Sequence, residues 1–385
     1  MERCINFDWI EVFCIELGDP KTPEYFEQNG WRGDVKVRAY GTPQYKQMFT
    51  LYNKSFPLIE IRRDPYSIKS LGGIFDPRAC HLRLSNRTCY LPDPIGFLKS
   101  FMHKYGFSYQ NTTRLDLCLD FQHFDNNDNP KIFLRDYFAN KYTKVHQPRF
   151  HAYGNDERDS KTWNSVKWGA PSSSITTKIY NKSLELEQVG DKPYIRQQWE
   201  QCGFNPLSDV WRIEFSMKSE YKSMCRVDLD TDTGELQHNV IDIDIQTFSN
   251  RDFVLFTFFA IADYYLDFRY IEYNRNGQLK RKYDSKRKVL FRTTADERAY
   301  HPAKLTEQKP ANKTDYMLIK KLKEIVSDYE HYKYNERIGA AAAIDGIVRN
   351  IAYKRMNGAA DIVMYPVEYN HIADNFKRST ENAVQ

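Results

Sequence analysis

The chain has 385 residues, a formal net charge of +5, and 27 Tyr, 24 Phe and 6 Trp. This aromatic content excludes disorder as the dominant state, because disordered chains are poor in aromatic residues. The longest strongly apolar run, 254–262, is too short to cross a bilayer, which needs about 20 residues. The length suggests two domains, or one large domain with an appendage.

Cysteine and histidine usage favours a reducing compartment. The seven Cys are an odd number without a Cys-x-x-Cys motif, so neither a disulfide framework nor a zinc ribbon is indicated. No His-x-His pair is present, and no basic segment followed by an apolar one opens the chain. We therefore expect a cytoplasmic protein without a signal peptide.

Along the chain, short alternating runs predict strands and Pro-led segments predict helices. The predicted strands are 7–13, 58–61, 80–84, 115–121, 176–180 and 211–217, and the predicted helices among them are 94–105 and 130–141. This irregular mixture indicates an α+β domain over residues 1–245. Residues 246–385 are expected to form a basic, mainly helical accessory region, with helices at 252–266, 315–334 and 336–356, a linker at 301–312 and a tight turn at Asn276-Gly277.

The positive charge is concentrated in one stretch. Residues 270–323 contain fifteen Lys or Arg against six Asp or Glu, so the rest of the chain is net negative. Lysine and arginine neutralise phosphates, and aromatic rings stack on bases. The stretch therefore predicts contact with nucleic acid, although a solvated surface arm is the alternative. The predicted DNA-binding residues in it are Lys280, Arg281, Lys282, Lys286, Arg287 and Lys288, interleaved with Tyr270, Tyr273 and Tyr283.

The strand 115–121 carries two carboxylates. Alternation places Asp116, Cys118 and Asp120 on one face and apolar residues on the other. Carboxylates in such a strand need a metal ion, a basic residue or loop donors, unless their face is open to solvent. Oxygen ligands would favour Mg²⁺ or Mn²⁺ over zinc.

Two further strands carry polar residues at alternate positions. In 211–217, Arg212 and Glu214 share a face, which indicates either an ion pair or a carboxylate ligand beside a phosphate-binding arginine. Lys178, Tyr180 and Lys182 share another face if their strand continues. Flanking ammonium groups are expected to favour the phenolate, which would make Tyr180 a nucleophile toward a phosphodiester. A strand tyrosine between two surface lysines is the alternative.

These pieces occur in the order found in the replication initiation factor family, which the chain resembles over residues 5–220. That family includes rolling-circle replication initiators and relaxases of some conjugative elements. The similarity is carried by Phe7-Asp8-Trp9-Ile10, by residues 113–120, by the small-residue turn at 166–173, by the Tyr-x-Lys-x-x-Glu pattern at 180–185, and by the Trp-Arg-Ile-Glu-Phe strand at 211–215.

The resemblance implies an HUH-like endonuclease fold with a central antiparallel sheet flanked by helices, and no His-x-His metal pair. It implies that Tyr180 nicks one DNA strand through a 5′-phosphotyrosyl link. Lys182 and Arg212 would stabilise phosphate charge, and Lys178 would contact DNA. Asp116, Asp120 and Glu214 would bind Mg²⁺ or Mn²⁺ or act in acid–base catalysis. The expected partners are origin DNA, recognised double-stranded and cleaved single-stranded, a helicase, and a second copy of the chain; no membrane is expected.

Three alternatives remain open at this point. A relaxase for conjugative mobilisation would use the same chemistry as a replication initiator of a plasmid, phage or mobile element. A DNA-binding regulator would use the same fold without catalysis. A tyrosine recombinase is disfavoured by the strand context of Tyr180, because such enzymes place their tyrosine near the end of a helical domain.

Overall fold

The computed structural model describes residues 3–66, 76–125, 127–157, 160–218, 223–229, 236–242, 245, 247–249, 251–292 and 300–301. The chain forms two compact units, of which the first, 1–64 with 77–305, contains nearly all described residues. The helices are α1 (Pro23–Gln28), α2 (Asn86–Cys89), α3 (Pro94–Tyr105), α4 (Pro130–Phe138), α5 (Lys182–Val189), α6 (Pro193–Gln201) and α7 (Arg251–Tyr265), with 3₁₀ turns η2 (Thr247–Ser249) and η3 (Lys282–Asp284).

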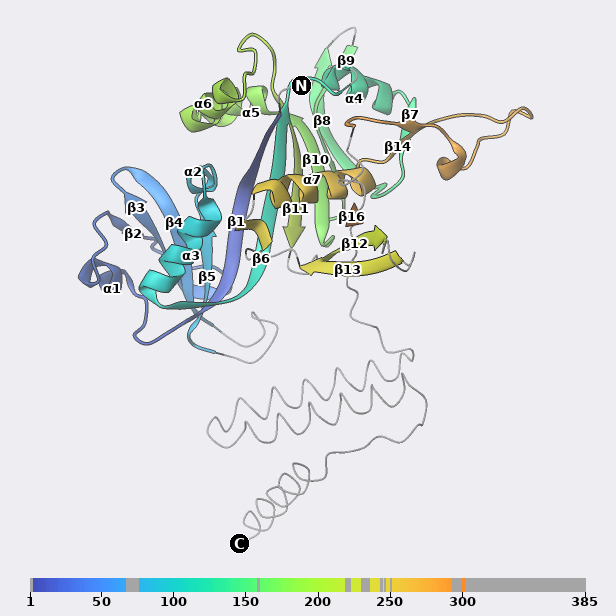
Figure 1. Cartoon of the computed structure of the whole chain (residues 1–385). Coiled ribbons are helices and arrows are strands. Elements are labelled where there is room, and N and C mark those ends of the chain that lie inside the picture. The colour runs from blue at the N-terminus through green and yellow to red at the C-terminus, as the bar shows by residue number, and fades with distance from the viewer. Residues whose placement is uncertain are drawn as a thin grey trace, which may run out of the picture. The chain divides into compact units, whose positions relative to one another are not determined.

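A large sheet of ten strands organises this unit (Figure 1). Its order is β2-β3-β4-β5-β1-β6-β11-β10-β9-β8, and the neighbours from β4 to β8 pair antiparallel. Its strands are β1 (Cys4–Glu16), β2 (Val35–Val37), β3 (Tyr45–Asn53), β4 (Phe56–Pro65), β5 (Ala79–Leu84), β6 (Phe107–Phe121), β8 (Phe150–Glu157), β9 (Ser160–Trp168), β10 (Ile175–Asn181) and β11 (Trp211–Lys218). The predicted mixed fold with a central antiparallel sheet is confirmed, and all six predicted strands belong to this sheet.

Two small sheets accompany the large one. One pairs β7 (Tyr142–Lys144), β14 (Phe268–Tyr270) and β15 (Arg287–Lys288), and the other pairs β12 (Ser223–Leu229), β13 (Leu236–Asp242) and β16 (Tyr300–His301). The first of them holds the two ends of segment 271–286, which is the first part of the basic stretch, because β14 precedes this segment and β15 follows it.

Helix α3 shows why the local sequence signals were reliable. The Asp93 side chain accepts a hydrogen bond from the Gly96 amide at the N-terminus, and Pro94 occupies the first turn. Gly106 ends the helix in the left-handed conformation that favours glycine (φ 70°). The predicted helix 94–105 is therefore confirmed with the same bounds, and the helix predicted at 130–141 ends earlier, at Phe138.

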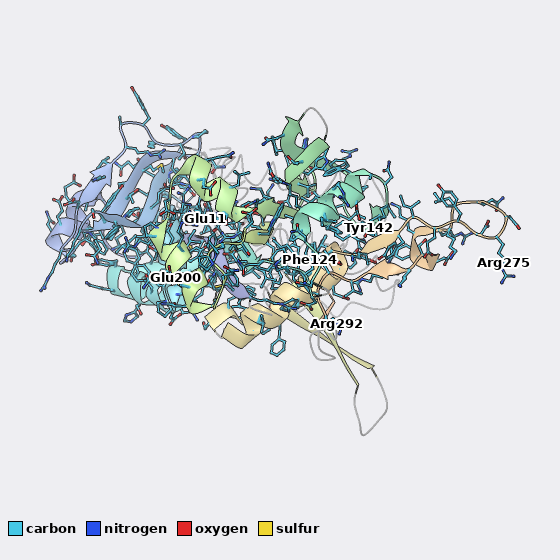
Figure 2. The ribbon with its side chains drawn as sticks, turned by 90° about the horizontal axis from the view of Figure 1, so that it is seen from above. Glu11, Phe124, Tyr142, Glu200, Arg275 and Arg292 are labelled. Atoms are coloured by element: carbon cyan, nitrogen blue, oxygen red, sulfur yellow. The ribbon has the colours of Figure 1, made fainter. Side chains whose placement is uncertain are left out.

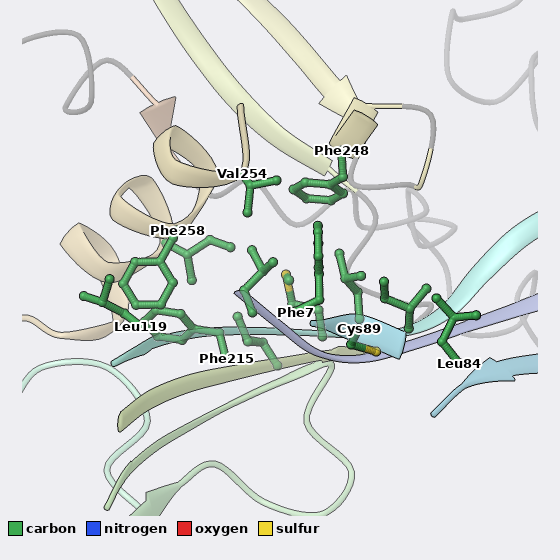
Figure 3. Close-up of a cluster of buried hydrophobic side chains, with 14 of the residues drawn as sticks. Phe7, Leu84, Cys89, Leu119, Phe215, Phe248, Val254 and Phe258 are labelled. Carbon is green, nitrogen blue, oxygen red and sulfur yellow. The ribbon is translucent and has the colours of Figure 1, made fainter. Parts of the chain in front are cut away.

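The apolar face of the sheet packs against α3 and α7 in one core, and Figure 3 shows the part beneath α7. Phe258 of α7 contacts Phe215 of β11 with ring centroids 5.0 Å apart, and Phe248 meets Phe7 of β1 edge-on at 6.0 Å. The predicted helix 252–266 is confirmed as α7. It belongs to the same compact unit as the sheet, so the domain boundary expected at residue 245 does not separate α7 from the predicted catalytic part.

The remaining predictions for the C-terminal region concern residues outside the described ones. They are the helices at 315–334 and 336–356 and the linker at 301–312 beyond His301. Among the described helices, none combines the length and the apolar character that a bilayer crossing requires.

Candidate active site

Three neighbouring strands bring the predicted catalytic residues together on the polar face of the sheet. Strand β11 lies between β6 and β10, and its Arg212 pairs in register with Asp120 on one side and Tyr180 on the other. Two residues after Arg212 in β11, and on the same face, Glu214 pairs with Lys178 of β10. The shared faces predicted from alternation are thus joined into one polar surface.

Tyr180 lies at the centre of this surface and is 4% exposed. Its hydroxyl donates a hydrogen bond to Oε2 of Glu214 at 3.1 Å and accepts one from Nζ of Lys182 at 3.4 Å. Nζ of Lys178 lies over the ring, 3.7 Å from its centroid, and therefore contacts the face of the ring rather than the hydroxyl.

The expectation that flanking ammonium groups favour the phenolate is wrong for this structure. Burial, followed by the negative charge of Glu214, raises the pKa of Tyr180 well above its usual value. Burial also raises the pKa of Glu214 to about 7, with further contributions from the charges of Asp8 and Asp116. The phenol therefore stays protonated until a base removes its proton, and Glu214 is the base within hydrogen-bond distance.

Lys182 reaches Tyr180 from a helix and not from the strand. Strand β10 ends at Asn181, whose side chain accepts a hydrogen bond from the Leu184 amide and so caps α5. Lys182 opens that helix, is 1% exposed and forms an ion pair with Glu185. Its ammonium group still lies beside the Tyr180 hydroxyl, although the expected continuation of the strand does not occur.

Arg212 is completely buried, and three of its nitrogens have partners in this structure. Nε and Nη2 bind the Asp120 carboxylate at 2.5 and 2.7 Å, Nη1 binds Asp8 at 2.6 Å, and Nη2 also donates to the Tyr90 hydroxyl at 2.5 Å. Trp199 of α6 donates a further hydrogen bond to Asp120 at 2.7 Å. Arg212 therefore connects β11, β6, β1 and the end of α2, and it positions the site.

Removing the Asp120 carboxylate is expected to destabilise the fold. Asp120→Ala would leave the Arg212 guanidinium buried with less compensating charge, which costs about 3–5 kcal/mol for buried pairs. Urea denaturation measures this difference. Asp191→Ala is the matched control, because Asp191 pairs with Arg196 at the surface and such pairs contribute about 0–1 kcal/mol. Equal losses in the two variants would contradict a structural role for Asp120.

The described residues do not present a ready metal centre. Within the ranges described above, no group of three or more His, Cys, Asp or Glu is arranged to hold a cation. Asp120 is bound by Arg212, Asp116 is bound by both Nε and Nη2 of Arg114 at 2.9 and 2.6 Å, and Glu214 accepts from Tyr180. The assignment of these three carboxylates to Mg²⁺ or Mn²⁺ stays a prediction.

Sequence reasoning did not single out three residues of the site. Asp8 lies where the pairing of β1 with β6 shifts between Phe7 and Trp9, and this irregularity accompanies its contact with Arg212. An aspartate inside an apolar strand was an available signal for Asp8. Tyr90 and Trp199 gave no such signal, because only the tertiary fold brings the end of α2 and helix α6 to the sheet.

Within the predicted DNA-binding stretch, residues 271–286 form an arm that extends from β14 and returns at β15, with Arg275 near its far end (Figure 2). The turn predicted at Asn276-Gly277 is confirmed, since Gly277 has a φ of 72° and its amide donates to the Asn274 carbonyl. Exposed side chains along the arm include Arg275, Arg281, Lys282, Lys286, Tyr273 and Tyr283.

The six basic residues predicted to bind DNA fall into two groups. Lys280 pairs with Glu272 at 3.0 Å, Arg287 pairs with Asp263 at 2.8 Å, and Lys288 pairs with Asp128. The pairs of Arg287 and Lys288 fasten the base of the arm to the rest of the unit, and the pair of Lys280 with Glu272 lies within the arm. Arg281, Lys282 and Lys286 are exposed, so they are the better placed of the six to meet a polyanion.

Comparisons with known proteins give a likeness in structure but none in sequence. No protein-family model and no curated protein matches the chain. Among solved structures, the chain is similar to a rolling circle replication initiator protein from Geobacillus stearothermophilus, with a TM-score of 0.42 and 14% sequence identity. The match covers 73% of this chain and 94% of that one. A likeness of this extent does not define a family, and the chemistry of the site carries the functional argument.

Proposed function

We propose that the chain is a DNA endonuclease and strand transferase in which Tyr180 attacks a phosphodiester at a replication or transfer origin. The observation that carries this proposal is the hydrogen bond from the Tyr180 hydroxyl to Glu214, a carboxylate whose pKa is about 7. A general base works best when its pKa lies near the working pH and when it contacts the proton that it removes.

The proposed step begins with proton transfer from the Tyr180 hydroxyl to Glu214. The phenolic oxygen then forms a bond to phosphorus while the bond to the 3′ oxygen breaks, which leaves a 5′-phosphotyrosyl link. The leaving 3′ oxygen takes the proton back from Glu214 and departs as a hydroxyl. The Lys182 ammonium group, 3.4 Å from the reacting oxygen, is positioned to offset the charge that builds up on the phosphate. Attack of a 3′-hydroxyl on the link reverses the step and transfers the strand.

Access to Tyr180 requires a rearrangement of side chains. Because Tyr180 is 4% exposed, a phosphate reaches its oxygen only after covering groups move. Lys178 is the group we expect to move, since it lies over the ring and an incoming phosphate would attract its ammonium group. This movement is consistent with the prediction that Lys178 contacts DNA.

We place recognition of double-stranded origin DNA on the arm. Replacing both Arg281 and Lys282 by Gln is expected to weaken duplex binding. It should also make the fall of log affinity with log salt less steep by about 1.8, since each phosphate contact contributes about 0.9 to this slope. Fluorescence anisotropy over a salt series measures the slope. Replacing Lys36 and Lys54 by Gln removes the same charge from exposed positions around β3 and should leave the slope unchanged. A slope that falls equally in both double variants would argue against the arm as the contact.

Divalent metal dependence is a separate part of the proposal. Chelation with EDTA is expected to stop nicking, and Mg²⁺ or Mn²⁺ is expected to restore it. Unchanged nicking in EDTA would overturn this part and leave the roles of Tyr180 and Glu214 intact. A helicase and a second copy of the chain as partners, and a cytoplasmic location, stay predictions.

The burial of Tyr180 supports a second candidate function, a DNA-binding regulator without catalysis. A structural tyrosine would be buried and hydrogen-bonded in the same way. The deciding experiment incubates the full chain with a supercoiled plasmid that carries the DNA surrounding its gene. Relaxed plasmid with covalently attached protein supports the nuclease, whereas binding without any adduct supports the regulator. Replication initiator and conjugative relaxase share this chemistry, and a replication or transfer assay on the same DNA separates them.

A further inference from the structure

Strand β1 carries a tryptophan that lies between two arginines on the polar face of the sheet. Strands β5 and β6 flank β1 on its two sides, and Arg83 and Arg114 both pair in register with Glu11. The guanidinium carbons lie over the Trp9 ring, 4.1 Å from its centroid for Arg83 and 4.2 Å for Arg114. The two arginines come from the strands on either side of β1, so both flanking strands place a guanidinium group against the same indole.

Carboxylates hold the two guanidinium groups in place. Arg114 binds Asp116 through two hydrogen bonds, and Arg83 lies 3.7 Å from Glu60. The indole nitrogen donates to Glu11 at 3.3 Å. The side chains of Arg83 and Arg114 nevertheless stay 30% and 39% exposed, so each presents surface to solvent. The result is a stack of planar, cationic and aromatic groups that is held by carboxylates and partly exposed to solvent.

The stack borders the proposed active site. Arg114 also donates to Ser216 of β11, and its partner Asp116 contributes to the raised pKa of Glu214. Trp9 and Tyr180 are on strands three places apart, which separates the strand axes by about 14 Å. The register places Trp9 level with Thr176, so Tyr180 lies a further four residues, about 13 Å, along the strand direction. A single strand that places a phosphate at Tyr180 would extend over the stack within a few nucleotides.

We propose that Arg83, Trp9 and Arg114 form a binding site for single-stranded nucleic acid, in which unpaired bases beside the scissile phosphate stack on the guanidinium faces. Guanidinium planes and aromatic rings are surfaces on which unpaired bases stack, and their positive charge suits a polyanion. The inference rests on the proposed function for the position of the scissile phosphate. The binding itself needs no chemistry and is tested without it.

The test uses the full chain with Tyr180→Phe, which binds without cleaving, and a fluorescent single-stranded oligonucleotide of about 16 nucleotides, near the upper site size of simple single-strand binders. Trp9→Leu and Arg83→Gln are each expected to weaken binding about tenfold in anisotropy titrations. Trp9→Phe keeps an aromatic ring between the arginines and should retain most of the affinity. Arg83→Gln should also lower the salt slope by about 0.7, which Trp9→Leu should not.

Tyr52→Leu is the matched control, because Tyr52 also contacts a cation, Lys36 at 4.4 Å, but on the far edge strands of the sheet. Its affinity should equal that of the parent. The proposal is overturned if Trp9→Leu and Arg83→Gln fold, as judged by circular dichroism, and bind like the parent. It is overturned as well if Tyr52→Leu weakens binding as much as they do. Absence of nicking by the wild-type chain would refute the nuclease proposal alone, because the binding data do not depend on cleavage.

Discussion

Tyr180→Phe is expected to abolish both nicking and the covalent protein–DNA adduct. The substitution removes the only atom that forms the bond to phosphorus in the proposed step, and loss of a nucleophile lowers rates on the order of 10³-fold or more. The fold should persist, since the ring stays in place and only the hydrogen bonds with Glu214 and Lys182 are lost. Plasmid relaxation and a denaturing gel of labelled DNA measure nicking and adduct separately.

A half-buried tyrosine outside the site supplies the control for this result. Tyr137 also loses one hydrogen bond when replaced by Phe, because its hydroxyl accepts from Trp168, but it lies outside the site. Tyr137→Phe should therefore nick and attach like the wild-type chain. An adduct that forms equally well with Tyr180→Phe would show that another group is the nucleophile.

Glu214→Gln is expected to slow adduct formation by about 10²–10⁴-fold, the usual contribution of a general base. Gln keeps the shape of the side chain and can still accept from Tyr180, but it cannot take the proton. In the wild-type chain the rate should rise with pH and level off above about 7, as Glu214 loses its proton. In the variant this dependence should disappear. Rapid-mixing assays across a pH series measure both effects.

As the pH rises, the stability of the wild-type chain should fall while its rate of adduct formation rises. The folded-state pKa of Glu214, about 7, lies above its usual 4.5, so the native chain retains a proton that the unfolded chain has released between these values. Unfolding free energy therefore falls as the pH rises from about 4.5 to about 7, and Glu214→Gln should be more stable than the wild type above that range. Glu200→Gln on the exposed face of α6 is a control for both measurements. A variant that is slower only because it is unfolded would contradict the assignment of Glu214 as base.

Much of the fold could be predicted because local rules and tertiary demands agree. In 115–121 the alternating apolar residues face the core that α7 covers, so periodicity and packing give the same strand. Helix α3 has its cap, its proline and its terminal glycine in the sequence. The end of strand β10 was not predictable from alternation, because Asn181 caps helix α5. The strand therefore ends before Lys182, although alternation alone would have continued it.

The site was less predictable, because its residue types were visible but their partners were not. Alternation predicts which face of its strand Asp120 occupies, and likewise for Arg212, and the strand register brings these two faces together. From residue type alone, however, Asp120 is predicted to bind a metal ion and Arg212 a phosphate. The structure pairs them with each other because α6 covers that end of the sheet, and burial requires each charge to find a partner. The contribution of Asp8 depends on β1 lying beside β6, which no local pattern specifies.

The contact between Asp8 and Arg212 joins positions 204 residues apart in the chain. Strand β1 is synthesised first but occupies the middle of the sheet, so β6 has to join it, and β11 has to join β6, after much of the chain has left the ribosome. Tyr180 therefore meets Glu214 and Arg212 only when the sheet is nearly complete. A nascent or truncated chain that lacks β11 would lack the proposed base, so under the proposed mechanism it should not cut DNA before β11 joins the sheet.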